Sequence, residues 1–170
     1  IFDARGIEAA KNYYDDAGRL YKTVDATGKA TLFGHDVAGR TETITDRAGH
    51  TTRHVYDERG NIKRTETPDG TVTASSYHHW SDGSLSSLKS IESVTGLFTN
   101  DAGQLVQQTF TTRYAYEDDD AGTPLANDGL LRKLIDPLGN VTRFAYDGRG
   151  NILSMIDART NAAGGTITPT

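Results

Sequence analysis

The chain has 170 residues, a net charge of −5 and only 35% apolar residues, a composition that makes a large compact core implausible. It has no cysteine, which excludes disulfides and cysteine-based zinc sites, and no apolar run approaches the ~18 residues of a membrane span. Its lysines and arginines form no run, so nucleic acid is a poor candidate for a partner.

Residues 1–76 form regular repeats with a period of 21, in which a tyrosine or histidine and then a polar residue recur at positions 14, 35, 56 and 77. Asp opens a turn by bonding its own backbone, and Gly supplies the positive φ that closes it. We therefore expect Gly18, Gly60 and Gly150 at positive φ. The motif Tyr-Asp-x-x-Gly and one near copy occur as Tyr14-Asp15-Asp16-Ala17-Gly18, Tyr56-Asp57-Glu58-Arg59-Gly60, Tyr146-Asp147-Gly148-Arg149-Gly150 and His35-Asp36-Val37-Ala38-Gly39.

A second turn is predicted inside each unit. A loop of this length that ends in glycine is typical of a type I turn with a bulge, so each unit holds two turns and two strands of about six residues. Helical periodicity is not sustained, and the sequence predicts an all-β fold of repeated antiparallel hairpins in a curved or spiralling sheet. The second turns are Asp25-Ala26-Thr27-Gly28, Asp46-Arg47-Ala48-Gly49, Asp136-Pro137-Leu138-Gly139 and a shortened Pro68-Asp69-Gly70.

The first break in the pattern covers residues 77–99, which are predicted as a degenerate, loop-rich repeat. Ser81-Asp82-Gly83-Ser84 and Ser86-Ser87 have the composition of a loop. We therefore expect an alanine at Gly83 to destabilise the chain less than an alanine at Gly60.

Repeats resume over residues 100–157, where Asn100-Asp101-Ala102-Gly103 is a weaker copy of the motif and Tyr116-Glu117 a further one. This part carries an acidic insertion at about 117–128. Residues 158–170 are predicted as a tail or as the start of the next unit.

The copies resemble the YD repeats of the RHS family, which also occur in Tc-toxin C components, bacterial wall-associated proteins and teneurins. The resemblance covers Asp3 to about Asp157. It implies hairpins that wind into a long sheet closed as a hollow shell, and a secreted or cell-surface location. In bacteria such shells enclose a C-terminal toxin, and in animal relatives they form part of an adhesion ectodomain. The chain begins and ends within the pattern, so we expect it to be a piece of a longer protein.

Asp136-Pro137-Leu138-Gly139 matches four letters of the element at which RHS cores typically cleave themselves ahead of the toxin. It stands at an ordinary second-turn position, however, and the repeat continues to Tyr146-Asp147. A turn carboxylate in water is expected to keep a pKa near ~3.9 and to be ionised at neutral pH. We therefore predict that the chain has no catalytic residue, does not cleave itself and is not an enzyme.

Aromatic residues offer an alternative role in sugar binding. An exposed tryptophan can stack on a sugar, so Tyr77, His79 and Trp80 are candidate sugar contacts. A ladder of tyrosines at the repeat position could form a similar strip, although we expect it to pack unit on unit, because aromatic neighbours stabilise sheets. The ladder consists of Tyr14, Tyr56, Tyr77, Tyr116 and Tyr146.

Two groups of residues could bind metals, but both have unsuitable spacing. His78 and His79 are adjacent and would point to opposite faces of a strand, with Asp82 as the obvious third ligand. Glu117-Asp118-Asp119-Asp120 with Asp128 could hold Ca²⁺, yet the run lacks the spaced carboxylates of a calcium loop. We predict no metal and no cofactor.

The leading interpretation is a structural repeat module of an RHS-type β-shell or spiral that encloses or presents a toxin or other effector. Its expected partners are further YD repeats of the same chain or of neighbouring copies, an enclosed C-terminal toxin domain, and glycans. The alternative is a carbohydrate or cell-surface adhesion module that uses Trp80 and exposed tyrosines. A fragment of a processing protease is a third interpretation, which the turn position of Asp136 disfavours.

Overall fold

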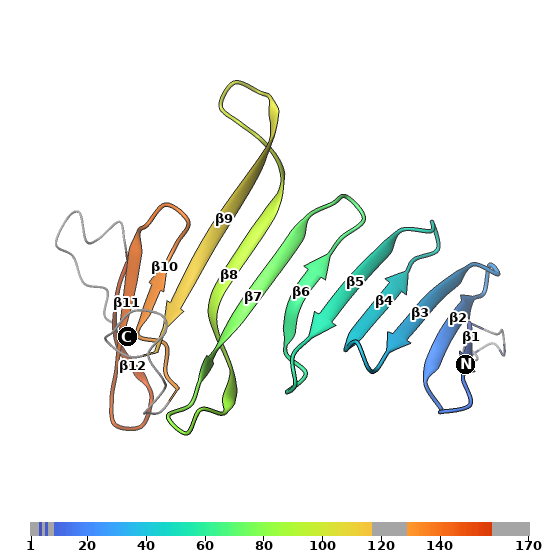
Figure 1. The fold of residues 1–170 in the computed structure, drawn as a ribbon, viewed down its shortest axis with the longest axis horizontal. Coiled ribbons are helices and arrows are strands. Elements are labelled where there is room, and N and C mark those ends of the chain that lie inside the picture. Colours follow the sequence, from blue (N-terminus) through green and yellow to red (C-terminus); the bar gives the residue numbers. More distant parts are fainter. Residues whose placement is uncertain (1–3, 5, 7–8, 117–128, 158–170) are drawn as a thin grey trace. The chain divides into compact units, whose positions relative to one another are not determined.

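A computed structural model describes residues 4, 6, 9–116 and 129–157 of the chain. Within these ranges the regular structure consists of 12 antiparallel β-strands and no helix, as the sequence predicted (Figure 1). The chain divides into two compact units, Ile1–Val72 and Thr73–Thr170. In each unit the strands follow one another across the sheet in the order of the sequence, so consecutive strands are joined as hairpins.

The first unit contains six short strands of 5 to 7 residues, the length that the spacing of the turns predicted. Short strands arise because a turn motif interrupts the chain at short and regular intervals. Their side chains alternate between the two faces of the sheet. The strands are β1 (Ala10–Tyr14), β2 (Leu20–Asp25), β3 (Ala30–Asp36), β4 (Thr41–Thr45), β5 (Thr51–Tyr56) and β6 (Ile62–Glu66).

The second unit contains two much longer strands, of 15 and 11 residues. These two strands, β8 and β9, pair from Ile91↔Arg113 to Thr99↔Leu105. The next strand, β10, pairs with β9 only at Arg113, Tyr114 and Ala115, so the β8–β9 hairpin extends beyond it (Figure 1). The strands of this unit are β7 (Val72–His79), β8 (Leu85–Thr99), β9 (Leu105–Ala115), β10 (Lys133–Ile135), β11 (Val141–Tyr146) and β12 (Ile152–Ile156).

The prediction of a loop-rich segment at residues 77–99 was wrong for residues 85–99, which form β8. Serine favours loops because its hydroxyl competes for local backbone bonds, but here partner strands satisfy the backbone. The serine side chains fit the close packing of the sheet: Ser86 is 0% and Ser90 8% exposed. The turn before β8 is short and begins at Trp80, whereas the repeat position Tyr77-His78 lies within β7.

Little of the described chain is fully buried. Ala115 is the buried apolar residue of the described part, and the other buried residues are the polar Asp57, His78, Ser86 and Ser90. A thin sheet with two partly wet faces explains the low apolar content. Stability therefore depends on strand hydrogen bonds, cross-strand pairs and turns more than on a large core.

The three Tyr-Asp-x-x-Gly hairpins share one irregularity. In each, the register shifts by one residue at the tyrosine, between Tyr13 and Tyr14, between Val55 and Tyr56, and between Ala145 and Tyr146. Such a β-bulge bends the strand locally and increases its twist. The bulge is thus part of the repeat and recurs wherever the full motif occurs.

Candidate functional site

The recurrent polar feature of the chain is a turn built around one aspartate, and Asp57 shows it most fully. The Asp57 amide donates to the carbonyl of Asn61 at 2.9 Å, and the Gly60 amide donates to the carbonyl of Asp57 at 3.2 Å. The Asp57 Oδ1 accepts from the amides of Arg59 and Asn61, each at 2.9 Å. One carboxylate oxygen thus satisfies two turn amides that the strand ladder leaves free.

The fifth residue of the turn binds the second carboxylate oxygen. Asn61 Nδ2 donates to Asp57 Oδ2 at 2.7 Å. Arginine replaces asparagine at Arg19, whose Nε donates to Asp15 Oδ2 at 2.8 Å. Sequence analysis missed this role, although arginine, asparagine or histidine directly follows the turn glycine in most copies. The residues that occupy the position and bind Oδ2 are Arg19, His50, Asn61, Asn140 and Asn151.

The same turn geometry recurs in both units. Turns that bond from the first residue to the fifth open at Asp15, Asp25, Asp46, Asp57, Thr67, Trp80, Asn100, Asp136 and Asp147. In the turns that open at Thr67 and Trp80, an aspartate at the third position replaces the missing carboxylate. Asp69 Oδ1 accepts from the Thr71 amide at 3.0 Å, and Asp82 Oδ1 accepts from the Ser84 amide at 2.8 Å.

Two sequence predictions about these turns need correction. The turn that contains Asp69 is not shortened, because it begins at Thr67 and has the same bonds as the others. Gly83 does not lie in a loop, because it closes a regular turn at φ 82°. The predictions for Gly18, Gly60 and Gly150 are confirmed, with φ of 76°, 85° and 85°.

The near copy that begins at His35 has a different turn. Here Arg40 adopts positive φ, at 48°, and Gly39 does not. The Gly39 amide donates to Asp36 Oδ1 at 2.8 Å, and the Arg40 amide donates to the carbonyl of Val37 at 3.3 Å. Asp36 pairs directly with Thr41 across the hairpin, so residues 37–40 form the loop and no bulge follows.

Hydrogen bonds hold the turn carboxylates in the ionised form. The Asn140 side chain and the amides of Asn140 and Leu138 lower the pKa of Asp136, and the Asn151 side chain and nearby amides lower the pKa of Asp147. The pKa values of these two carboxyls therefore lie below the expected value of ~3.9. A carboxylate that is bound in its charged form and has a lowered pKa is a poor proton donor at neutral pH.

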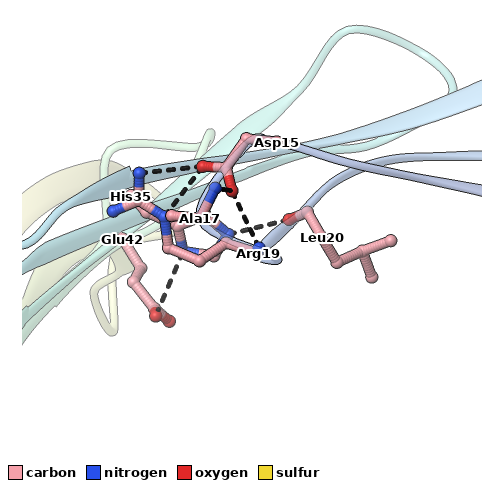
Figure 2. Close-up of polar contacts among 6 residues, drawn as sticks. All are labelled: Asp15, Ala17, Arg19, Leu20, His35 and Glu42. Carbon is pink, nitrogen blue, oxygen red and sulfur yellow. Dashed lines mark hydrogen bonds and ion pairs between the residues drawn. The ribbon is translucent and has the colours of Figure 1, made fainter.

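The aromatic or histidine residue of the motif bonds back to the preceding hairpin. His35 Nε2 donates to the carbonyl of Leu20 at 2.8 Å, and its Nδ1 lies 3.3 Å from Glu42 Oε1 (Figure 2). Tyr146 makes the same backward bond, its hydroxyl donating to the carbonyl of Leu131 at 2.8 Å. In both cases the acceptor lies 15 residues earlier in the chain.

Tyr56 uses a neighbouring carboxylate in place of a carbonyl. Its hydroxyl donates to Glu42 Oε2 at 3.2 Å, and its backbone amide donates to the carbonyl of Arg40 at 2.9 Å. Burial, with the charge of Glu42 and this hydrogen bond, raises the pKa of the Tyr56 phenol. These phenols and His35 thus tie one hairpin to the previous one.

The candidate sugar contacts lie near the turn between β7 and β8. His79 is exposed, whereas Tyr77 and Trp80 are half-buried. A Cβ built on Gly129 would stand 3.8 Å from Trp80 Cη2, so Gly129 lies beside one edge of the indole. The role of these three residues as sugar contacts stays a prediction.

The predicted alternation of His78 and His79 is observed. His78 is 5% exposed, donates from Nε2 to the carbonyl of Tyr114 at 3.0 Å and packs edge-to-face on Tyr116 at 5.1 Å between ring centres. The part of the chain that the structure describes contains no group of three or more potential metal ligands. The acidic run 117–120 and Asp128 lie outside the described residues.

Comparison with known proteins agrees with this repeated geometry. No curated protein matches the chain. The solved structure of TcdB2-TccC3-TEV is 18% identical with a TM-score of 0.57, and the match covers 88% of this chain and 8% of that chain. This likeness concerns the fold, and the chain corresponds to a small part of that protein.

Two other solved structures match with TM-scores too low to inform the fold. The Photorhabdus luminescens Tc holotoxin pore is 14% identical over 86% of this chain and 14% of that chain, with a TM-score of 0.27. A porin-like protein from Bacteroides uniformis is 14% identical over 86% of this chain and 80% of that chain, with a TM-score of 0.28.

The model of the family described as RHS Repeat matches residues 14–52, 38–72 and 127–166, which together make up more than half of the sequence. The matched segments contain the full Tyr-Asp-x-x-Gly motifs, their aspartate turns and the backward bonds of His35 and Tyr146. RHS repeats are a structural repeat family, and this chain belongs to it.

Proposed function

We propose that the chain is a structural segment of an RHS-type β-shell or spiral in a longer protein, and that this shell encloses or presents a toxin or other effector. The observation that supports the proposal is the backward bond of His35 and of Tyr146, each of which links its own hairpin to the one before it. Such links extend a sheet by one hairpin at a time, and each unit needs its neighbours.

The proposal assigns no catalytic role to the chain. Asp136, which matches the self-cleavage element by its letters, binds Asn140 through both carboxylate oxygens and has a lowered pKa. A general acid would need a raised pKa. The expected location, outside the cell or at its surface, follows from the family resemblance. Within the described residues no helix is long and apolar enough to cross a membrane.

Sugar binding at Trp80 receives less support from the structure. An effective sugar platform exposes a flat ring, but Trp80 is half-buried, with Gly129 beside one edge of its indole. A glycan array on the full chain and on Trp80→Leu tests this role. Binding that disappears in the variant would support a carbohydrate module, and a negative array would remove Trp80 as a ligand residue.

Protection from protease tests enclosure directly. The experiment treats the complete polypeptide that contains this chain with a broad-specificity protease, with and without a denaturant that unfolds the repeats. We expect the segments that follow the repeats to resist cleavage until the repeats unfold. Equal rates of cleavage with and without denaturant would contradict enclosure.

A further inference from the structure

The outer edge of β9 lacks a neighbouring strand over most of its length. One edge of β9 pairs with β8, from Leu105 to Arg113. On the other edge β10 pairs only with Arg113, Tyr114 and Ala115. Within the described residues no strand therefore covers this outer edge over 105–112, where the β8–β9 hairpin extends beyond β10 (Figure 1). The N–H and C=O groups of such an edge are a template for pairing with another chain.

The hydrogen bonds of the hairpin show which backbone groups face this edge. The Asn100 amide donates to the Gln104 carbonyl at 2.9 Å, so the backbone of Gln104 faces β8. Backbone groups of an antiparallel strand alternate between its two edges, and the β8–β9 register shows no shift. In the same phase the Ala115 carbonyl faces β10, where it accepts from the Arg132 amide at 2.8 Å. The residues whose N–H and C=O groups point to the outer edge are thus Leu105, Gln107, Thr109 and Thr111.

This edge has none of the usual features that prevent pairing with another chain. Edge strands of natural proteins are commonly protected by lysines, prolines or bulges. Residues 105–112 contain no charged residue and no proline, and their pairing with β8 has no bulge. Two of their apolar side chains are exposed, Leu105 at 69% and Phe110 at 38%. The composition is that of a strand with a partner on both sides.

We propose that two copies of this chain associate by pairing the outer edges of β9 antiparallel into one continuous sheet, about a two-fold axis at Gln108. In this register Leu105 of one copy lies opposite Thr111 of the other. Gln107 of one copy likewise lies opposite Thr109 of the other. All four residues carry outward-facing groups, so the two strands exchange about eight main-chain hydrogen bonds. This association goes beyond the structural role in a shell and does not depend on the enclosure of an effector.

The apolar side chains of β9 complement each other in the same register. Val106 of one copy lies opposite Phe110 of the second copy, and an apolar cross-strand pair of this kind stabilises a sheet. Phe110 already packs edge-to-face on Phe98, with 4.9 Å between ring centres. The pairing therefore extends an existing aromatic contact across the two-fold axis and covers the exposed part of the Phe110 ring.

The charges at the two ends of β9 also complement each other. Asp101 lies in the turn before β9 and Arg113 near its end, both are exposed, and neither has an ion-pair partner within the described residues. Because Arg113 lies opposite Gly103 of the second copy, the turn with Asp101 comes to the same end of the sheet as this guanidinium. The stretch 101–113 is neutral in a chain of net charge −5, so two copies approach here without net repulsion.

Cysteine cross-linking tests the register, because the chain has no cysteine of its own. Gln108→Cys places two cysteines opposite each other on the axis, with Cα atoms about 4.5 Å apart, which suits a disulfide. Leu105→Cys is the matched control, since its two copies would lie roughly 20 Å apart along the strands although the site is more exposed. Under mild oxidation we expect Gln108→Cys to form covalent dimers at least about tenfold faster. Equal rates, or a faster Leu105→Cys, would overturn the register.

Analytical ultracentrifugation of the full chain over a range of concentrations tests the association itself. We expect a dimer whose dissociation constant rises at least about tenfold in Gln107→Lys, because the lysines of the two copies meet at the paired edge. The control Thr99→Lys adds the same charge on β8 of the same hairpin and should change the constant less than about threefold. Circular dichroism verifies that each variant folds. A chain that stays monomeric, or a dimer that Gln107→Lys leaves unchanged and that therefore forms at another edge, would overturn the proposal.

Discussion

The first unit and the β8–β9 hairpin are both antiparallel, yet β8 is more than twice as long as any strand of the first unit. The strands of the first unit have 5 to 7 residues, whereas β8 has 15. A turn that contains glycine follows every strand of the first unit, but none occurs between Gly83 and Asn100. The difference shows that the turn motif sets strand length in this chain. Where the motif is missing, the strand continues even through a serine-rich segment.

Removing the turn carboxylate should produce the largest effect, and the effect should differ between the two regions. Asp57 is 9% exposed and accepts three hydrogen bonds, so Asp57→Ala should lower the free energy of unfolding by about 2–3 kcal/mol. Asn100 makes the corresponding bonds in the β8–β9 turn with a neutral side chain. Asn100→Ala should therefore cost about 1 kcal/mol.

Urea denaturation of both variants, followed by circular dichroism, measures this difference. An effect of Asp57→Ala no larger than that of Asn100→Ala would show that burial and charge do not strengthen the turn of the first unit.

Glycine substitutions should have the next largest effect on stability, and the effect should be the same in the two regions. Gly60 and Gly83 have φ of 85° and 82°, which disfavours a residue with a Cβ. Each alanine variant should therefore lose about 1 kcal/mol of stability, in contrast to the smaller effect that the sequence suggested for Gly83. Gly148 is the control, because its φ is not positive and a Cβ there has open space. If Gly83→Ala left the free energy of unfolding unchanged, the turn at Gly83 would not share the backbone constraint of the other turns.

Acid should weaken the aspartate turns as a class. Hydrogen bonds from the side chains of Thr27 and Arg47 lower the pKa of Asp25 strongly, and bonds from the amides of His50 and Ala48 lower the pKa of Asp46. A folded pKa below the unfolded value of ~3.9 means that the unfolded chain takes up protons first. This stabilisation is therefore complete well above pH ~4 and is lost as the pH falls through the lower, folded values.

Melting temperatures between pH 7 and pH 2.5 measure the acid effect. Asp25→Asn, which cannot titrate, should show a shallower decline below pH ~4 than the unmodified chain. Identical pH profiles for the two chains would contradict a role for the Asp25 charge in stability.

Self-cleavage is expected to have no measurable extent. Asp136 is ionised and bound to Asn140, so its carboxyl is not available as an acid. The intact mass of the purified chain should stay unchanged over days at neutral and mildly acidic pH. A discrete cut near Leu138 that disappears in Asp136→Asn would contradict this expectation and favour the protease interpretation.

Sequence analysis succeeded where the determinants are local. Gly18, Gly60 and Gly150 could be placed at positive φ because the bonds of each turn lie within a short stretch of chain. It failed at residues 85–99, because β8 is held by pairing with β9, which depends on distant residues. It missed the backward bonds of His35 and Tyr146, since their carbonyl acceptors have no signature in the sequence.

The position of Lys11 and Lys22 over the ring of Tyr13 shows a further limit of sequence reasoning. The sequence has no lysine run, yet alternation in a strand brings residues two positions apart onto one face. Register between β1 and β2, together with the bulge at Tyr14, was needed to bring Lys11 and Lys22 to the same ring. The register of the two strands cannot be derived from the spacing of the motif alone.

Residue-resolved amide hydrogen exchange of the native chain tests the central claim, that turn motifs alone set the lengths of these strands. In the first unit, the account predicts fast exchange at the second residue of each turn that opens at Asp15, Asp25, Asp46 or Asp57. The turn carboxylate binds the amide of the third residue and not that of the second. The strands between these turns should be protected. It predicts protection of at least every second amide over the paired residues Ile91–Thr99, because antiparallel pairs alternate between hydrogen-bonded and non-hydrogen-bonded. The next turn amide expected to exchange fast is that of Asp101, since the Ala102 amide binds Asn100 Oδ1. Fast exchange throughout residues 86–98 would show a loop in place of β8 and would contradict the account.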